Sequence, residues 1–166
     1  MGPAGWCDMS EEFTHLDERG AARMVDVSAK DITVRTATAS GCVRVSPEVI
    51  GLLRAGGVPK GDALAVARIA GIQAAKRTPD LVPLCHPLAI HGVDVGLEVA
   101  DDAVMITATV RTADRTGVEM EALTCVSVAG LALVDMVKAV DPAAVITDIR
   151  LDEKTGGKRG HWTRPS

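Results

Sequence analysis

Residues 68–87 read RIAGIQAAKRTPDLVPLCHP, an alanine-rich segment that runs into a loop bounded by prolines. The first half predicts a helix that begins after Asp62, a favourable N-cap, and ends before Pro79, because proline disfavours helical geometry in the preceding residue. Four small residues allow another backbone to pack closely against this helix: Ala67, Ala70, Gly71 and Ala74. We therefore expect the helix to form a tight layer with a second element of the fold.

The loop that follows holds a thiol and an imidazole between two rigid residues. Pro83 and Pro87 restrict φ on both sides of Leu84, Cys85 and His86. One hypothesis is that these side chains are held in place for binding or catalysis. The alternative is a buried structural thiol beside a histidine whose hydrogen bonds are satisfied, and residue types alone leave the two equally open.

Hydrophobic periodicity predicts the other elements around this stretch. Apolar and polar residues alternate over 93–99 and 104–110, and Asp101-Asp102 predicts the tight turn of an antiparallel hairpin. The remaining expected elements are a strand over 31–45 with a break near Gly41, a helix from Ser46-Pro47 to Gly56-Gly57, a long apolar helix over 118–140, and a strand over 144–151.

In chain order these elements read β-α-α-β-β-α-β. This order suits an α+β sandwich, in which an antiparallel sheet is covered by helices on one face. A chain of 166 residues is long enough for one domain with a full core. We predict a flexible leader over residues 1–19, a single α+β domain over 20–152, and a basic, glycine-rich tail over 153–166 that contributes to the site.

Composition narrows the class of protein. Apolar residues make up 47% of the chain but aromatic residues only 2%, so the core must consist of Val, Leu, Ile and Ala. The net charge of −4 argues weakly against nucleic acid as the main partner. The longest uncharged apolar run, residues 122–134, is shorter than the roughly 18 residues that a membrane span needs. The four cysteines form no C-x-x-C pair and no signal peptide precedes them, which favours a cytoplasmic protein with reduced thiols.

The helix expected over 118–140 carries three charged residues on one stripe. Asp135 and Lys138 lie three positions apart, and steps of three and four lead back to Glu121. Charged groups on an apolar helix are costly to bury unless they are paired, so a structural ion pair and a proton-transfer pair in a cleft both fit. We expect burial to raise the pKa of Asp135 and the neighbouring ammonium to lower it.

The separation along this helix adds a geometric constraint. Glu121 and Asp135 are 14 positions apart, which corresponds to about 21 Å along a straight helix. One small molecule cannot contact both side chains within one chain. Either Glu121 belongs to the preceding loop, or two chains share one site.

Basic side chains indicate an anionic ligand. Seven of them are candidates for phosphate contacts: Lys60, Arg68, Lys76, Arg77, Lys154, Lys158 and Arg159. Lys60 precedes a helix N-terminus, where free N–H groups favour an anion, although a lone loop lysine is more often simply solvated. Gly156-Gly157 would let backbone N–H groups wrap an oxyanion, and plain disorder of the tail is the alternative. The chain has no P-loop pattern, and the adjacent Cys85-His86 lacks the spacing of a zinc site.

Seven short motifs stand in a distinctive order along the chain: Met24-Val-Asp-Val-Ser28, Lys60-Gly-Asp62, residues 67–76 (ARIAGIQAAK), Leu84-Cys-His-Pro87, Gly117-Val-Glu-Met-Glu-Ala-Leu-Thr124, Asp135-Met-Val-Lys138 and Gly156-Gly-Lys158. Together they resemble the cyclic pyranopterin monophosphate synthases, the molybdenum cofactor biosynthesis protein C family. The resemblance covers about residues 14–160. Each motif alone is a weak signal, whereas the ordered set is highly specific.

The resemblance implies a ferredoxin-like fold and an enzyme, a phosphorus–oxygen lyase of molybdenum cofactor biosynthesis. Its substrate would be the GTP-derived 3′,8-cyclo-7,8-dihydroguanosine 5′-triphosphate, and its products cyclic pyranopterin monophosphate and pyrophosphate. No cofactor would be required, with Mg²⁺ left open as a companion of the triphosphate. The resemblance further implies a homo-hexamer built as a trimer of dimers, with each site at a dimer interface and with no nucleic-acid or membrane partner.

The resemblance also assigns roles to residues of this chain. Asp135 would be the catalytic acid–base group, with Lys138 and Lys60 essential beside it. Substrate contacts would come from the following residues: Leu84, Cys85, His86, Glu119, Met120, Glu121, Arg68, Lys154 and Lys158. Among these, Glu119 and Arg68 would line or support the pocket. The roles of Lys154 and Lys158 are predicted from the sequence and not from the resemblance: they lie beside glycines in the tail and would hold the triphosphate together with Lys60.

Two other classes of protein compete with this hypothesis. A ferredoxin-like regulatory module that binds a nucleotide or another metabolite needs a pocket but no proton-transfer pair. Such a module would keep its function after replacement of Asp135 or Lys138. A purely structural oligomer would not need Lys60 or Lys154 at all.

Overall fold

The computed structural model describes residue 17, residues 19–158 and residues 160–165. Five strands form one antiparallel sheet: β1 (Thr33–Arg44), β2 (Ile90–Val99), β3 (Ala103–Asp114), β4 (Val145–Thr155) and β5 (Trp162–Thr163). Their spatial order is β2-β3-β1-β4-β5. The predicted hairpin is confirmed, since Val99 pairs with Val104 on either side of the Asp101-Asp102 turn.

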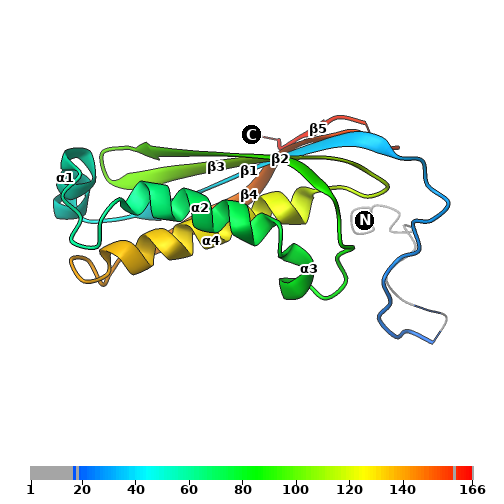
Figure 1. The fold of residues 1–166 in the computed structure, drawn as a ribbon, viewed down its shortest axis with the longest axis horizontal. Helices are drawn as coiled ribbons and strands as arrows, with labels where there is room; N and C mark the ends of the chain where they lie inside the picture. The colour runs from blue at the N-terminus through cyan, green and yellow to red at the C-terminus, as the bar shows by residue number, and fades with distance from the viewer. Residues whose placement is uncertain (1–16, 18, 159, 166) are drawn as a thin grey trace, which may run out of the picture.

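In the described part of the chain, four helices accompany the sheet: α1 (Pro47–Ala55), α2 (Ala63–Ala75), α3 (Thr78–Leu81) and α4 (Glu119–Val137). Figure 1 shows α2 and α4 side by side against one face of the sheet, with α1 at one end of the molecule. The helices α2 and α4 are the two crossovers of a β-α-β-β-α-β unit whose sheet order is β2-β3-β1-β4. This topology confirms the predicted α+β fold with an antiparallel sheet covered on one face.

Local capping explains where the first two helices begin and end. The Ser46 hydroxyl accepts a hydrogen bond from the Val49 N–H at 3.4 Å, and the Asp62 carboxylate accepts one from the Ala65 N–H at 2.9 Å. Gly56 ends α1 in the left-handed conformation, with φ of 66°. These three boundaries were predicted from the sequence.

The end of α2 differs from the prediction. The helix stops at Ala75, four residues before Pro79, and Pro79 instead lies in the first turn of α3. The buried Thr78 hydroxyl donates to the carbonyl of Ala75 at 3.1 Å, which satisfies a group that the helix end leaves free. A side chain therefore ends α2 early, and proline opens a new short helix, where its missing N–H costs nothing.

The strand β1 is unbroken at Gly41, contrary to the expected interruption. A Cβ at Gly41 would lie 2.9 Å from Val126 Cγ1 and 3.0 Å from Ile149 Cγ1. The irregularity appears instead in the pairing of β1 with β4, which shifts register between Ser40 and Cys42. Gly41 thus allows α4 and β4 to approach the strand closely.

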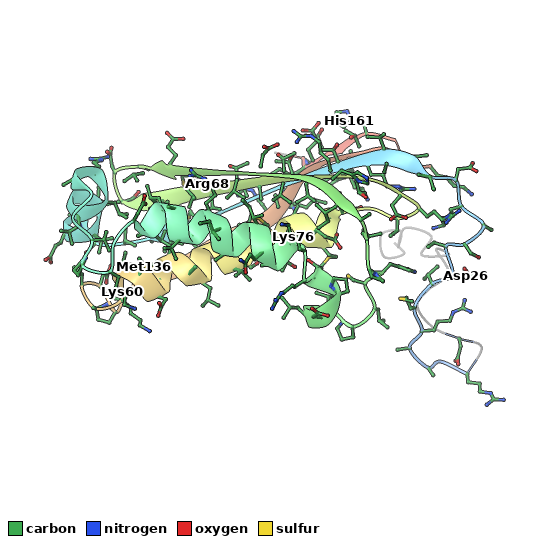
Figure 2. The ribbon with its side chains drawn as sticks, in the orientation of Figure 1. Asp26, Lys60, Arg68, Lys76, Met136 and His161 are labelled. Carbon is green, nitrogen blue, oxygen red and sulfur yellow. The ribbon has the colours of Figure 1, made fainter. Side chains whose placement is uncertain are left out.

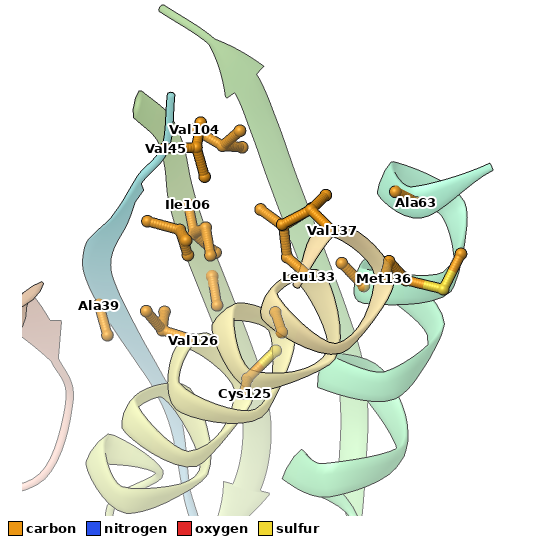
Figure 3. Close-up of a cluster of buried hydrophobic side chains, with 14 of the residues drawn as sticks. Ala39, Val45, Ala63, Val104, Ile106, Cys125, Val126, Leu133, Met136 and Val137 are labelled. Carbon is orange, nitrogen blue, oxygen red and sulfur yellow. The ribbon is translucent and has the colours of Figure 1, made fainter. Parts of the chain in front are cut away.

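The core lies between the sheet and the α2–α4 layer, and Figure 3 shows part of it. As the composition predicted, it consists of aliphatic side chains, among which Ile106 and Leu133 are the largest that are fully buried. Alanines and a glycine on α2 face α4, and a Cβ on Gly71 would lie 2.9 Å from the Cys125 carbonyl oxygen. The small residues of the opening stretch therefore allow α2 and α4 to pack together with close backbone contact.

We expect Gly71→Ala to destabilise the protein by about 1–2 kcal/mol, because the overpacking of α2 against α4 outweighs the better helix propensity of alanine. The matched control is Gly51→Ala in α1, where an added Cβ meets nothing within 4 Å. That change should stabilise the protein by about 0.5–1 kcal/mol. Urea unfolding of both variants measures the difference, and equal effects would contradict the close helix contact.

The C-terminal part of the chain is more ordered than its composition suggested. The strand predicted over 144–151 continues through Thr155 in β4, and β5 pairs with it through Trp162 and Lys154. Lys154 therefore stands on the sheet itself. The predicted leader lies almost wholly outside the described residues, as does Arg159.

The helix α4 is long and apolar enough to cross a membrane by length and composition alone. Half of its most apolar 18-residue window is buried inside the protein. Buried positions repeat along it through Cys125, Ala129 and Leu133. It is the core helix of the fold.

Candidate functional site

A carboxylate bridges two ammonium groups where α4 ends. Asp135 lies in the last turn of α4, and Lys138 Nζ is 2.7 Å from Asp135 Oδ1. Lys60, in the turn before α2, donates from Nζ to Asp135 Oδ2 at 3.2 Å and to the Asp135 carbonyl at 2.8 Å. We call these three residues the lysine–aspartate cluster. The tertiary fold thus adds Lys60 to the pair that helical spacing predicted.

The environment of Asp135 differs from the expected one. Its side chain is 57% exposed, and hydrogen bonds from Lys138 and then Lys60 lower its pKa below the usual range. The ammonium groups lower this pKa as expected, while the raising effect of burial is the smallest of the causes because the side chain faces solvent. Glu121, Leu131 and Asp135 lie on one stripe of α4, at steps of three and four residues. Glu121 at its start is buried, whereas Leu131 and Asp135 near its end face solvent. Asp135 is therefore ionised at neutral pH.

A pocket of about 360 Å³ lies at the other end of α4, where the helix begins. It is lined by the predicted loop and helix residues and by the segment before β1: Leu84, Cys85, His86, Met120, Glu121, Val25, Val27 and Lys30. We call this the thiol pocket. Glu119 also lines it, so the fold brings together six of the residues that the sequence proposed for substrate contacts.

The imidazole in this pocket has a defined orientation. His86 Nε2–H donates to the Val25 carbonyl at 2.6 Å. In the neutral ring the other nitrogen, Nδ1, is then an acceptor. His86 thus ties the segment before β1 to the proline-bounded loop.

Burial makes the acid of the thiol pocket a proton-exchange group. Glu121 is only 3% exposed, and burial raises its pKa to about 7. Burial, and then the charge of Glu121, also raise the pKa of the Cys85 thiol. Cys85 is therefore a neutral thiol at pH 7, whereas Glu121 can take up or release a proton near this pH.

A second, basic pocket of about 270 Å³ adjoins the thiol pocket. The two share Lys30, Gly117 and Glu119 as lining residues. The cations that line the basic pocket are Lys30, Arg35, Lys154 and Lys158. Lys154 Nζ donates to Glu119 Oε1 at 2.9 Å, so one of the four positive charges is already paired.

A glycine turn closes the basic pocket. Gly156 has φ of 92° and Gly157 φ of 70°, which is the region that favours glycine. A Cβ on Gly156 would clash with the Val34 carbonyl, and one on Gly157 with the Arg35 guanidinium. The predicted Gly-Gly turn therefore packs directly against β1 and places Lys158 beside the pocket.

The two halves of the candidate site are far apart within one chain. The helix α4 is continuous from Glu119 to Val137, so Glu121 belongs to the helix and not to a loop. Figure 2 shows Lys60 and Asp26 at opposite ends of the long axis of the molecule. The explanation that Glu121 belongs to the loop is therefore wrong, and the site shared between chains stays a prediction.

Three of the basic candidates stand apart from both pockets. Arg68 is exposed on α2, where its Nε donates to the Val95 carbonyl at 3.2 Å. Lys76 caps the end of α2, and Arg77 precedes α3. Neither pocket of this chain includes these three side chains.

Comparison with known proteins identifies the family. The model of the MoaC family matches residues 24–157. The chain belongs to the MoaC family. This confirms the family that the seven motifs predicted.

Curated relatives match this MoaC-family chain over most of its length. A protein of Streptomyces coelicolor is 72% identical over 95% of this chain and 92% of its own length. One of Nocardioides sp. is 70% identical over 95% of this chain and 99% of its own length. Both are named cyclic pyranopterin monophosphate synthase, and a relative from Mycobacterium tuberculosis, 63% identical, is named cyclic pyranopterin monophosphate synthase 2.

Two cations of this MoaC-family site were missed from the sequence. Lys30 lies in the irregular segment before β1, and Arg35 lies near the start of that strand. Arg35 stands in a Thr/Val-rich strand as an interruption of the pattern, and this signal would have found it.

Within the described residues, no three or more His, Cys, Asp or Glu side chains are grouped to hold a metal ion. The positive charges of the basic pocket can instead meet an anion directly. Mg²⁺ as a companion of a triphosphate stays a prediction.

We expect Glu121→Gln to gain stability relative to the wild type as the pH rises from 5 to about 7. The folded chain keeps a proton on Glu121 up to about pH 7, whereas the unfolded chain loses it near the ordinary pKa of 4.5. Ionisation of the unfolded chain therefore lowers wild-type stability between these values, by roughly 2–3 kcal/mol. Glutamine has no proton to lose, so the variant escapes this penalty.

Urea unfolding at pH 5 and pH 8, at one protein concentration, measures the difference. The matched control is Glu98→Gln, which removes an exposed carboxylate on β2. If the free energies of unfolding of Glu121→Gln and wild type differed by the same amount at both pH values, the raised pKa of Glu121 would be contradicted.

Proposed function

We propose that this chain is a cyclic pyranopterin monophosphate synthase. It would convert 3′,8-cyclo-7,8-dihydroguanosine 5′-triphosphate to cyclic pyranopterin monophosphate, with release of pyrophosphate, in molybdenum cofactor biosynthesis. The observation that carries the proposal is a basic pocket that shares three lining residues with a pocket containing the buried Glu121, whose pKa burial raises to about 7. Membership of the MoaC family and the shared name of the relatives support it.

The basic pocket suits the triphosphate. Lys30, Arg35 and Lys158 offer ammonium and guanidinium donors, and Lys154 offers a fourth once its pair with Glu119 opens. Arginine binds phosphate oxygens in a bidentate fork, while lysine acts as a mobile point charge. These groups would hold the departing pyrophosphate while the nucleoside part enters the thiol pocket.

The reaction needs several proton transfers, because the purine-derived rings must open and close as the pterin forms. Asp135 is ionised at neutral pH and so begins as a proton acceptor, with Lys60 and Lys138 as donors at 3.2 and 2.7 Å. Glu121 exchanges protons near pH 7. In this assignment the lysine–aspartate cluster carries the chemistry, and the thiol pocket binds the substrate and shares a proton.

A second copy of the chain would complete the site. The cluster and the pockets lie at opposite ends of α4, which is too far for one small substrate. The outward surface of the helical layer carries exposed apolar side chains on α2 and α4: Val66, Ile69 and Leu131. We propose a homo-oligomer, a hexamer built as a trimer of dimers, in which one chain's cluster faces another chain's pockets.

The remaining parts of the proposal follow from chemistry. The enzyme would require no cofactor of its own. Three described cysteines, Cys42, Cys85 and Cys125, are free thiols, which suits a reducing cytoplasm. A regulatory module that only binds a nucleotide is not favoured, because it has no need for a carboxylate held between two ammonium groups.

The decisive test is incubation of the purified protein with the cyclised dihydro-GTP. Stoichiometric pyrophosphate and cyclic pterin should appear, and protein with Asp135→Asn should form neither. Binding of the substrate without either product would favour the regulatory module.

A further inference from the structure

The segment that forms one wall of the thiol pocket is held at two points. Residues 24–32 form no helix or strand, yet Val25, Val27 and Lys30 line the pocket. We call these residues the arm, which Figure 1 shows leaving the start of β1 at the end of the molecule far from α1. His86 binds the Val25 carbonyl, and Arg115 Nε donates to the Lys30 carbonyl at 2.8 Å. Each end of the arm is thus tied to the body by one side chain.

Arg115 is itself fixed by its neighbours. Its backbone N–H donates to Asp114 Oδ1 at 2.7 Å, and its carbonyl accepts from the Arg35 guanidinium at 3.2 Å. The Arg35 Nε also donates to the Asp114 carbonyl at 3.1 Å. A chain of hydrogen bonds therefore runs from the basic pocket through Arg115 to the backbone of Lys30.

Lys30 is the residue whose position matters most in the arm. Its side chain lines both the basic and the thiol pocket. Its own N–H donates to the Val27 carbonyl at 3.0 Å, a bond within the arm that sets the local turn but not its distance from the body. The Arg115 hydrogen bond is a contact of the Lys30 backbone that anchors this turn to the end of β3.

We propose that Arg115 is a positioning residue, which acts through Lys30 by holding the arm across the junction of the two pockets. This role adds a residue to the proposed site. Its kinetic effects rest on the proposed function, whereas its effect on the arm does not. Arg115 would not touch the substrate. Its removal would release the arm, lower the local concentration of the Lys30 ammonium at the phosphate groups and weaken substrate binding.

The first test needs no substrate. Hydrogen exchange of the peptide over residues 24–32 should become about tenfold faster in Arg115→Ala, since a charge-assisted hydrogen bond is lost. Arg115→Lys keeps a cationic donor and should restore most of the protection. The control is Arg111→Ala, which removes an exposed arginine of β3, the strand that Arg115 directly follows, where it pairs with Asp94 at 2.5 Å. Unchanged exchange in Arg115→Ala would overturn the proposal.

The second test is a kinetic double-mutant cycle. Arg115→Ala should raise KM about tenfold and change kcat less than about twofold, because it removes binding and not chemistry. In a Lys30→Ala background the same change should alter KM by less than about twofold, since Arg115 then has no ammonium to position. Additive effects of the two substitutions would show that Arg115 does not act through Lys30.

The two experiments test this proposal separately from the proposed function. A wild-type protein that turns over no substrate would remove the function, while the exchange experiment would still decide whether Arg115 holds the arm. Normal turnover with an arm that Arg115→Ala leaves protected would remove the positioning role alone.

Discussion

Asp135→Asn should lower kcat by about 10³-fold while the substrate still binds, because proton transfer by a positioned group contributes roughly 10²–10⁴-fold. Asparagine keeps the shape of the side chain but neither its charge nor its basicity. The two ammonium groups at Asp135 would lose the carboxylate that orients them. Calorimetric binding and a single-turnover product assay on the same preparation measure the two effects separately.

Two further variants sharpen this test. The matched control is Asp94→Asn, which likewise neutralises an exposed, paired carboxylate. Asp94 pairs with Arg111 and lies on β2, so this change should leave kcat unchanged. Lys138→Arg keeps the charge, yet a guanidinium does not readily give up a proton, so turnover should still fail. If Asp135→Asn turned over at nearly the wild-type rate, the acid–base role would pass to Glu121 or His86.

Glu121→Gln removes the proton-exchange group of the thiol pocket, so we expect it to be inactive like Asp135→Asn. Mixing the two kinds of inactive chain should restore about one quarter of the wild-type activity after subunit exchange. Half of the dimers formed at random are mixed. If each site takes its cluster from one chain and its pocket from the other, a mixed dimer has one intact site and one doubly defective site. The motive is the separation of Asp135 and Glu121 at the two ends of α4. Activity is measured before and after exchange at a fixed total protein concentration.

The control for this experiment is a pair of defects in one cluster. Chains with Asp135→Asn mixed with chains with Lys138→Ala should stay inactive, because each site then takes a damaged cluster from one chain. A fully active monomer at high dilution would contradict the shared site, as would recovery in the control mixture.

Much of the fold follows from local patterns in the sequence. The hairpin of β2 and β3 follows from alternation and a tight turn, and the starts of α1 and α2 follow from Ser46 and Asp62 as N-caps. These signals are readable because a cap or a period acts over a few neighbouring residues. The ordered set of motifs also predicted the MoaC family from the sequence alone.

Other elements depended on contacts with distant parts of the chain. The end of α2 is set by Thr78, whose hydroxyl satisfies the helix carbonyls before Pro79 is reached. The strand β4 runs through the polar residues up to Thr155 because β1 supplies its hydrogen-bond partners. Composition described this segment as a loose tail, and sheet pairing made it part of the basic pocket.

The site shows most clearly which features follow from local sequence patterns and which depend on the tertiary structure. Helical spacing predicted that Asp135 and Lys138 meet, since residues three apart share a face. No local pattern pairs Lys60 with this carboxylate, which only the family resemblance had implied, and none places Arg35 beside the glycine turn. The fold brings these residues together from positions 75 and 122 residues away along the chain. The pKa directions also needed the fold, because they depend on whether one helix stripe faces the core or solvent. That stripe buries Glu121 at its start and exposes Asp135 at its end.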